Sequence, residues 1–340
     1  MPYLRRFYAL VALLIGLAAS APAYAIPLLL VDLDTGEVLF NEEGGQPWHP
    51  ASLTKLMTAY VTFAAIQQGR ISLDTPITIS RNAWNQAPSK SGLAIGSSIT
   101  LKDALYILVV KSANDIAVAV AEAVSGSVPK FVDEMNTMAD AMGLSATHYV
   151  NPHGLHSEKQ VTSARDLAVL VLYLRRDYPQ YLPMFATEAV KLNEHVLESN
   201  NNLLLHFEGT TGMKTGYVCA SGLNIVATAE RQGRNMLAVV LGGSSARERN
   251  ELTAELFLRG FSGAVSGTGR SVLQVANTSS DPVNMRPLIC GKQAKAYIKE
   301  RGAPYRAGLR GQPTYLTDVI DGHVYTATDL GILRDVPLPR

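Results

Sequence analysis

The sequence has few charged residues, no internal repeat and no low-complexity tract. Charged residues make up 17% of the 340 residues and apolar residues 47%, which is typical of a well-packed globular protein and excludes a disordered one. The first 25 residues hold two basic and no acidic residues, so the rest of the chain has 28 basic and 29 acidic residues, a formal charge of −1. Nothing in this balance indicates nucleic-acid binding.

Histidines with the spacing of a metal centre are missing. Only His153 and His156 of the seven histidines lie close together, and no third ligand has a spacing typical of zinc sites. The G-x-S-x-G turn of α/β-hydrolases is also missing. A zinc-dependent enzyme and an α/β-hydrolase are therefore disfavoured, and no metal site is predicted.

Long apolar runs are missing too, and the one moderate run lies at the N-terminus. Arg5 and Arg6 precede an apolar run over residues 7–19, and Ala23-Tyr24-Ala25 is an A-x-A cleavage site, so residues 1–25 are predicted to be a signal peptide. The run is short for a membrane span, which leaves an uncleaved signal anchor as the alternative. No cysteine follows it, which disfavours a lipoprotein.

Cysteine is scarce, with Cys219 and Cys290 the only two in the chain. Export would make a disulfide chemically possible, and it would join the main domain to the C-terminal region. Two separate buried thiols are an equally ordinary arrangement. The sequence leaves this choice open.

Five apolar segments are predicted strands, and their pairing defines the expected fold. The first two and the last three would pair as hairpins in a mainly antiparallel sheet, with the intervening helices on its faces or in a separate lobe. The predicted fold class is therefore mixed α/β (α+β). The predicted strands lie near residues 27–33, 36–41, 213–220, 223–229 and 236–241.

Composition also suggests the domain organisation. We expect a main domain over residues 26–262, a Gly/Ser-rich linker over 263–271 and a small β-rich region over 272–340. Strand-like pieces in that last region are Val272–Ala276, Gln293–Ile298 and His323–Thr328. Glycines and prolines near the end, at Gly322, Gly331, Pro337 and Pro339, exclude a continuous amphipathic membrane-anchor helix.

The segment from Pro50 to Met57 is predicted to begin a buried helix. Pro50 suits helix entry, and Ser52 and Lys55, three residues apart, would share one helix face. A lysine kept neutral by a depressed pKa could remove the serine proton and create a nucleophile. The S-x-x-K pattern alone also occurs by chance. Apolar residues continue at helical spacing at Leu56, Met57, Tyr60, Val61 and Ala64.

Two further polar segments interrupt apolar surroundings. Ser112 and Asn114 lie between apolar helices predicted over residues 101–111 and 116–124, as either a capped turn or the wall of a site. Lys214-Thr215-Gly216 lies on a predicted strand, where a glycine allows close approach to the backbone. Its lysine and hydroxyl suit an acidic group, and a solvated edge strand is the alternative.

Together, in this order, Ser52-x-x-Lys55, Ser112-x-Asn114 and Lys214-Thr215-Gly216 form the set found in penicillin-binding proteins and serine β-lactamases. With the residues around them, and with Asn151-Pro152-His153-Gly154-Leu155, the sequence closely resembles the low-molecular-mass D-alanyl-D-alanine carboxypeptidases over about residues 26–262. The resemblance implies a β-lactamase/transpeptidase-like fold and a penicillin-binding serine peptidase. It also implies a role in peptidoglycan biosynthesis and cell shape, in the periplasm or cell-envelope space of a bacterium.

This resemblance implies roles for the catalytic residues, with no metal or organic cofactor. Ser52 would attack the carbonyl between the last two D-alanines of a peptidoglycan stem peptide, and Lys55 would accept its proton. Ser112 would return a proton to the leaving D-alanine, while Asn114 would orient Lys55 and the substrate amide. β-Lactam antibiotics, which mimic D-Ala-D-Ala, would acylate Ser52 and be released slowly.

The same resemblance implies binding roles around the strand. The backbone N–H groups of Ser52 and Tyr217 would form an oxyanion hole. Lys214 and Thr215 would bind the terminal carboxylate, with Gly216 beside them as a further substrate-binding residue. Lys214 would also help to keep Lys55 neutral. Arg249 would assist with the carboxylate, although Arg247 is close enough in sequence to compete for this role.

One residue departs from the family pattern, and rival functions remain. Thr211 stands where many relatives have aspartate.

A β-lactamase would need a deacylating base, for which Glu198 with Asn202 fits E-x-x-x-N but lies too near Lys214 in sequence. A DD-endopeptidase that cuts peptidoglycan cross-links is a second rival, and a non-catalytic cell-wall binding protein is a third.

Overall fold

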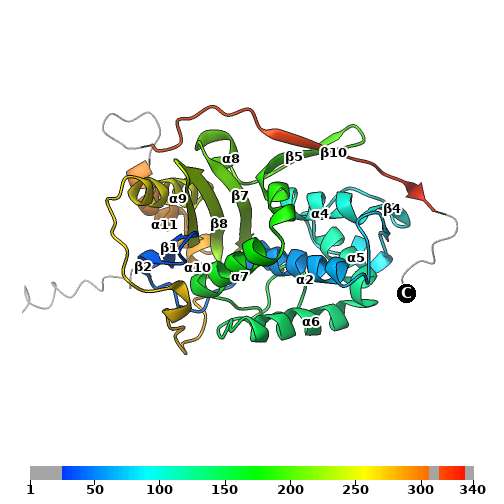
Figure 1. Ribbon diagram of the computed structural model, residues 1–340, viewed down its shortest axis with the longest axis horizontal. Helices are drawn as coiled ribbons and strands as arrows, with labels where there is room; N and C mark the ends of the chain where they lie inside the picture. Colours follow the sequence, from blue (N-terminus) through cyan, green and yellow to red (C-terminus); the bar gives the residue numbers. More distant parts are fainter. Residues whose placement is uncertain (1–24, 306–313, 334–340) are drawn as a thin grey trace, which may run out of the picture.

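The computed structural model describes residues 25–305 and 314–333, in which a sheet and a group of helices lie side by side (Figure 1). Except for Ala25, the predicted signal peptide lies outside the described residues. The main sheet has the strand order β2-β1-β9-β8-β7, and every neighbouring pair is antiparallel. All five predicted strands are confirmed. They are β1 (Leu28–Asp32), β2 (Val38–Glu42), β7 (Thr210–Val218), β8 (Gly222–Arg231) and β9 (Arg234–Gly243).

Alternate side chains of the sheet enter two different cores, because successive strand residues point to opposite faces. In β1, Leu29 and Val31 join a core with the helices α2 (Lys55–Gln67) and α7 (Ala164–Asp177). Leu30 points the other way, into a core with α9 (Ala246–Phe261). Both faces of the sheet are therefore covered by helices, which fixes its register and its orientation.

The segment between β2 and β7 supplies both the helices on one face of the sheet and those of the second lobe, and polar caps set where several of them begin. The hydroxyl of Thr100 accepts a hydrogen bond from the backbone N–H of Asp103 and starts α4 (Leu101–Val110). Ser163 caps α7 in the same way, so both N-termini gain a partner for an otherwise unpaired N–H group. The remaining elements of this lobe are α3 (Arg81–Trp84), α5 (Asn114–Ser125), α6 (Val128–Ala141), β3 (Pro76–Thr78) and β4 (Ser97–Thr100).

Residues 178–202 are more regular than their sequence predicts. They form a 3-10 helix, η2 (Pro179–Ala186), followed by an antiparallel hairpin of β5 (Thr187–Leu192) and β6 (His195–Glu198). The hairpin turn contains Asn193 in the left-handed backbone region, with φ of 53°, a conformation that asparagine tolerates.

The region after residue 271 is not β-rich where the sequence predicts strands. Residues 272–276 begin with a 3-10 helix, η3 (Val272–Gln274), and residues 294–298 lie in a helix, α11 (Ala294–Gly302). The expectation of two strands there is wrong, because α11 is built from Ala, Lys and Glu, which favour helix when few side chains are buried. The third predicted strand is confirmed as β10 (His323–Ala327).

The described strands of the C-terminal region pack against the main domain. Strand β10 pairs in parallel with β5, and the short β11 (Gly331–Ile332) pairs with β4. In the predicted linker, the backbone of Thr268 and Arg270 hydrogen-bonds to Val38. Within the described residues no helix has both the length and the hydropathy needed to cross a membrane.

Candidate active site

The predicted nucleophile lies on a tight turn just before α2. Ser52 belongs to the 3-10 helix η1 (Ala51–Thr54), and α2 begins only at Lys55, so the expectation that Ser52 lies within the α-helix is corrected by one turn. Both residues still share a face, and Lys55 Nζ lies within hydrogen-bond distance of Ser52 Oγ, at 3.1 Å.

Two acceptors fix the Lys55 amine in place. Its Nζ lies 2.7 Å from Oδ1 of Asn114 and 2.6 Å from the carbonyl oxygen of His153, and the side chain is fully buried. A neutral amine has two N–H bonds and one lone pair. When both N–H bonds are donated to these acceptors, the lone pair is left for the Ser52 hydroxyl. This geometry suits a base that takes the serine proton.

The electrostatic surroundings favour that neutral form. Burial lowers the pKa of Lys55 well below its usual value, and the charge of Lys214 lowers it further, although Asp115 acts in the opposite direction. Burial, with a contribution from Lys55, likewise lowers the pKa of His153 to about 3. The imidazole is therefore uncharged at neutral pH.

Ser112 and Asn114 come from the second lobe, and both line the cavity beside Ser52. Asn114 bridges the two halves of the site, since its Oδ1 accepts from Lys55 and its Nδ2 donates to the carbonyl of Ala87 over 2.9 Å. Ser112 has a left-handed backbone, with φ of 62°, and its buried hydroxyl has no hydrogen-bond partner among the described residues. Strained backbone conformations of this kind cluster at functional sites, and an unpaired buried hydroxyl requires an explanation.

Strand β7 supplies the opposite wall. Lys214 is buried, and its Nζ donates to the carbonyl of Thr215 over 3.1 Å. Burial and the nearby Arg249 lower the pKa of Lys214 to about 7. Gly216 has no room for a side chain, because a Cβ atom there would lie 2.9 Å from the backbone nitrogen of Ser52. The glycine thus lets β7 approach the nucleophile closely.

Of the two candidate arginines, Arg249 is the one beside this strand. It is buried, lines the same cavity as Ser52 and donates from Nη2 to the carbonyl of Asn200 over 3.0 Å. Arg247 points elsewhere, forming an ion pair with Glu251 and a hydrogen bond to the carbonyl of Tyr305.

One cavity of about 410 Å³ joins most of the predicted residues. Lys55 and Lys214 are not among its lining residues but are buried next to it. The part of the chain described by the structure contributes no Asp or Glu to the lining; Glu198 lies on β6, so Glu198 with Asn202 does not put a base there. The predicted residues that line the cavity are Ser52, Ser112, Asn114, Thr215, Gly216, Tyr217 and Arg249.

Sequence reasoning missed several residues that shape this cavity. Asn200 lines it, although only its place in a run of three asparagines marked it. Asn202 also lines it, although the sequence offered it only with Glu198 in the E-x-x-x-N pattern. Asn224 acts from β8, since its Nδ2 donates to the carbonyls of His49 and Pro50 over 3.0 and 3.3 Å. Asn224 therefore holds the turn that carries Ser52, and its only sequence signal was a polar residue inside an apolar strand.

A disulfide lies at the edge of the cavity. Cys219 and Cys290 are bonded, with Cα atoms 5.7 Å apart, which answers the question that the sequence left open. The bond joins the end of β7 to the end of α10 (Arg286–Ile289). Tyr217, half-exposed, directs its hydroxyl to 3.2 Å from Sγ of Cys290.

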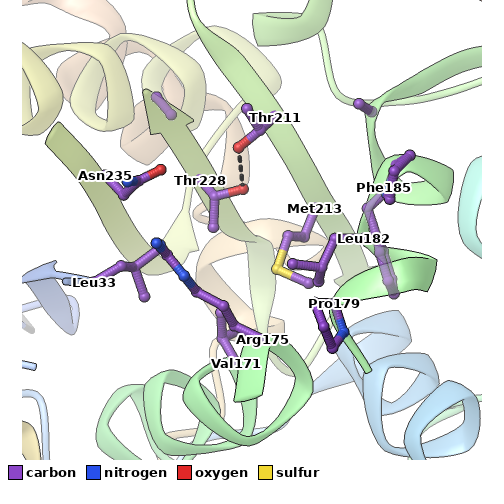
Figure 2. Close-up of a pocket in the computed structure, with 13 residues that line it drawn as sticks. Leu33, Val171, Arg175, Pro179, Leu182, Phe185, Thr211, Met213, Thr228 and Asn235 are labelled. Atoms are coloured by element: carbon purple, nitrogen blue, oxygen red, sulfur yellow. Dashed lines mark hydrogen bonds between the residues drawn. The ribbon is translucent and has the colours of Figure 1, made fainter. Parts of the chain in front are cut away.

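The departure at Thr211 faces away from this cavity. Thr211 lines a second cavity, which has a volume of about 470 Å³. Figure 2 shows its lining, which comes from Thr211 and Met213 of β7 and from residues of α7 and η2. The Thr211 hydroxyl donates to Thr228 on β8 over 2.8 Å. The threonine is thus tied to the neighbouring strand, and Lys214 lies on the side of β7 that faces Ser52.

Comparisons with known proteins identify the family. The sequence model described as D-alanyl-D-alanine carboxypeptidase, peptidase S11, matches residues 18–245. The chain is 35% identical over 259 residues to the D-alanyl-D-alanine carboxypeptidase DacD of Salmonella typhimurium, and 34% identical over 239 residues to DacA of Haemophilus influenzae. These matches cover 73% and 68% of this chain and 66% and 61% of the relatives. The chain belongs to the S11 family.

Solved structures agree with this assignment. The fold is similar to penicillin-binding protein 6B of Escherichia coli, with a TM-score of 0.66 and 34% identity over 72% of this chain and 80% of that one. It is also similar to penicillin-binding protein D2 of Listeria monocytogenes in its cefotaxime-bound form, with a TM-score of 0.63 and 28% identity over 69% and 96% of the two chains. The predicted β-lactamase/transpeptidase-like fold is confirmed.

Proposed function

We propose that this protein is a serine-type D-Ala-D-Ala carboxypeptidase that removes the terminal D-alanine from peptidoglycan stem peptides. The observation that carries the proposal is the buried Lys55 amine, which touches Ser52 and whose pKa is lowered well below its usual value. We further propose that the protein acts outside the cytoplasm, in the periplasm or cell-envelope space, and that β-lactams acylate it.

In acylation, the lone pair of Lys55 takes the Ser52 proton as Oγ attacks the carbonyl carbon between the two D-alanines. The negative charge that develops on the carbonyl oxygen is stabilised by the backbone N–H groups of Ser52 and Tyr217. The C–N bond then breaks, and Ser112 relays a proton to the departing amine. Water subsequently hydrolyses the acyl-serine, which regenerates the Ser52 hydroxyl.

The carboxylate end of the site supports cleavage of a terminal residue. Lys214 and Arg249 are buried beside Thr215, and burial makes an ionic contact with a substrate carboxylate stronger than it is in water. The Asn200 carbonyl holds Arg249 from behind. A substrate that ends in a free carboxylate would satisfy these cations. The site therefore suits a terminal D-alanine better than an endopeptidase substrate, whose chain continues past this point.

The test combines penicillin labelling with D-alanine release. Intact mass is measured after brief incubation with benzylpenicillin for the wild type and Ser52→Ala, and the same samples are assayed for D-alanine release from a pentapeptide. An adduct and free D-alanine, both lost in Ser52→Ala, are expected. An adduct without D-alanine would favour the endopeptidase. Rapid loss of penicillin without an adduct would favour a β-lactamase, and intact penicillin would exclude an acyl-serine enzyme.

A further inference from the structure

Residues 314–333, here called the C-terminal strap, run across both lobes of the molecule. In Figure 1 this segment passes from beside α9, over α8 (Leu203–His206) and the β5–β6 hairpin, to β4 at the far end of the second lobe. The active-site cavity lies between the same two lobes. The strap contacts the rest of the protein at Asp318 and at Tyr325. Each contact is made to a segment that leads directly into a wall of that cavity.

The first contact holds the segment that follows Asn200 and Asn202. The carboxylate of Asp318 accepts the backbone N–H of Glu208 over 2.6 Å and lies 3.6 Å from Arg231. The backbone of Asp318 and of Ile320 hydrogen-bonds to the carbonyls of residues 206 and 205. Asn202 immediately precedes α8, so the strap fixes the helix at the end of this wall. Arg249 shares the wall through the Asn200 carbonyl.

The second contact holds the helix that delivers Ser112. The Tyr325 hydroxyl donates to the carboxylate of Asp103 over 2.7 Å, and its ring stacks on Tyr106 with centroids 3.6 Å apart and planes 4° apart. Asp103 and Tyr106 both lie on α4, and Ser112 follows the end of that helix. The Asp103 carboxylate also accepts the backbone N–H of Thr328. The strap therefore contacts α4 through the side chain of Tyr325 and the backbone of Thr328.

We propose that Asp318 and Tyr325 are positioning residues, and that the C-terminal strap sets the separation between the two walls of the active-site cavity. The inference rests on the proposed carboxypeptidase function. One wall carries the carboxylate-binding Arg249 and the other carries Ser112 and Asn114, so substrate binding and proton transfer both depend on their separation. Misplacement by about 1 Å in such a site costs about a hundredfold in rate.

The experiment compares Asp318→Ala and Tyr325→Ala with a matched control in the full chain. Val319→Ala is the control, because Val319 lies in the same strap and is 93% exposed. Pentapeptide kinetics and benzylpenicillin acylation are measured per titrated active site, well below each melting temperature. Asp318→Ala should raise KM about tenfold. Tyr325→Ala should slow acylation about tenfold, and Val319→Ala should change neither by more than about twofold.

A second readout separates this inference from the proposed function. Hydrogen–deuterium exchange should rise at residues 199–206 in Asp318→Ala and at residues 111–115 in Tyr325→Ala, whether or not the enzyme releases D-alanine. Unchanged exchange at both walls, or wild-type kinetics despite a lower melting temperature, would overturn the positioning role. If an alanine variant does not fold, Asp318→Asn and Tyr325→Phe undergo the same two measurements. If the wild type itself neither releases D-alanine nor is acylated by benzylpenicillin, the proposed function is refuted instead.

Discussion

The Lys55 amine lies 3.1 Å from the Ser52 hydroxyl while Asn114 and the His153 carbonyl hold its other side. Each of these contacts comes from a different part of the chain, so the base is aimed by the fold and not by its own flexible side chain. Burial and the charge of Lys214 lower the pKa of Lys55, which would let a residue that is usually a cation serve as the proposed base at neutral pH.

Replacing this base should abolish most of the activity. In Lys55→Arg the guanidinium stays protonated and cannot accept the Ser52 proton. Acylation by benzylpenicillin should fall by about 10²–10⁴-fold, the usual contribution of a general base. Stopped-flow or quenched mass spectrometry measures the rate, with circular dichroism as the control for folding. A folded Lys55→Arg variant that keeps its rate within about tenfold would show that another group removes the proton.

Ser112 offers a prediction in which activity and stability separate. Its buried hydroxyl has no partner among the described residues, so removing it leaves no broken hydrogen bond in the fold. Ser112→Ala should therefore keep or slightly raise the melting temperature, while D-alanine release falls by about 10²–10⁴-fold because the proton relay is lost. Thermal unfolding and a D-alanine assay check the two halves. A clear loss of stability would indicate that Ser112 is a structural residue.

The catalytic motifs were predictable because their chemistry demands particular residues in a fixed order along the chain. The five strands were predictable because their apolar segments are long and lie beside clear turns. The choice between Arg247 and Arg249 was not predictable. Residues two apart on a helix are rotated by about 200° and lie on nearly opposite faces, and the sequence does not reveal which face of α9 is turned to the cavity. Only the structure shows which one faces the cavity.

Long-range partners account for the rest of what the sequence did not predict. Asn224, on β8, acts on His49 and Pro50, 175 and 174 residues away. The strap contacts of Tyr325 are similar, because tyrosines are common and nothing in the local sequence marks a partner on α4. The segment at 293–298 was misread for a different reason. Its helix has no buried side chain, so it lacks the apolar periodicity on which the prediction depends.

The pKa of Lys214 predicts the alkaline side of the pH profile. Its pKa of about 7 in the free enzyme means that raising the pH through 7 removes the charge that would bind the substrate carboxylate. Values of kcat/KM, which report on the free enzyme, should fall above about pH 7. A bound carboxylate raises the pKa of Lys214, so kcat should fall only at higher pH. In Lys214→Arg the alkaline fall in kcat/KM should move above pH 9, and an unshifted fall would assign it to another group.

Replacing Gly216 by alanine should reduce activity, and the same replacement at Gly302 is a matched control. In Gly216→Ala the new methyl would lie 2.9 Å from the backbone nitrogen of Ser52 and 3.0 Å from the Pro50 carbonyl, so β7 must move away from the nucleophile. Acylation should slow by about a hundredfold, as expected for a displacement of about 1 Å. Gly302→Ala, where no other described residue would crowd the new methyl within 4 Å, should leave the rate unchanged. Equal rates for the two variants would contradict the close approach.

The disulfide predicts a loss of stability that largely spares the chemistry. Cys219 and Cys290 are 71 residues apart, and closing a loop of that length typically stabilises a protein by about 2–4 kcal/mol. The Cys219→Ser/Cys290→Ser double variant should lose about this much free energy of unfolding in urea. Its acylation rate should stay within about threefold, because the ladder between β7 and β8 still holds Gly216 and Tyr217. Reductant should destabilise the wild type equally and leave the double variant unchanged. A wild type that keeps its unfolding midpoint after complete reduction, verified by mass, would show that the bond contributes little to the fold.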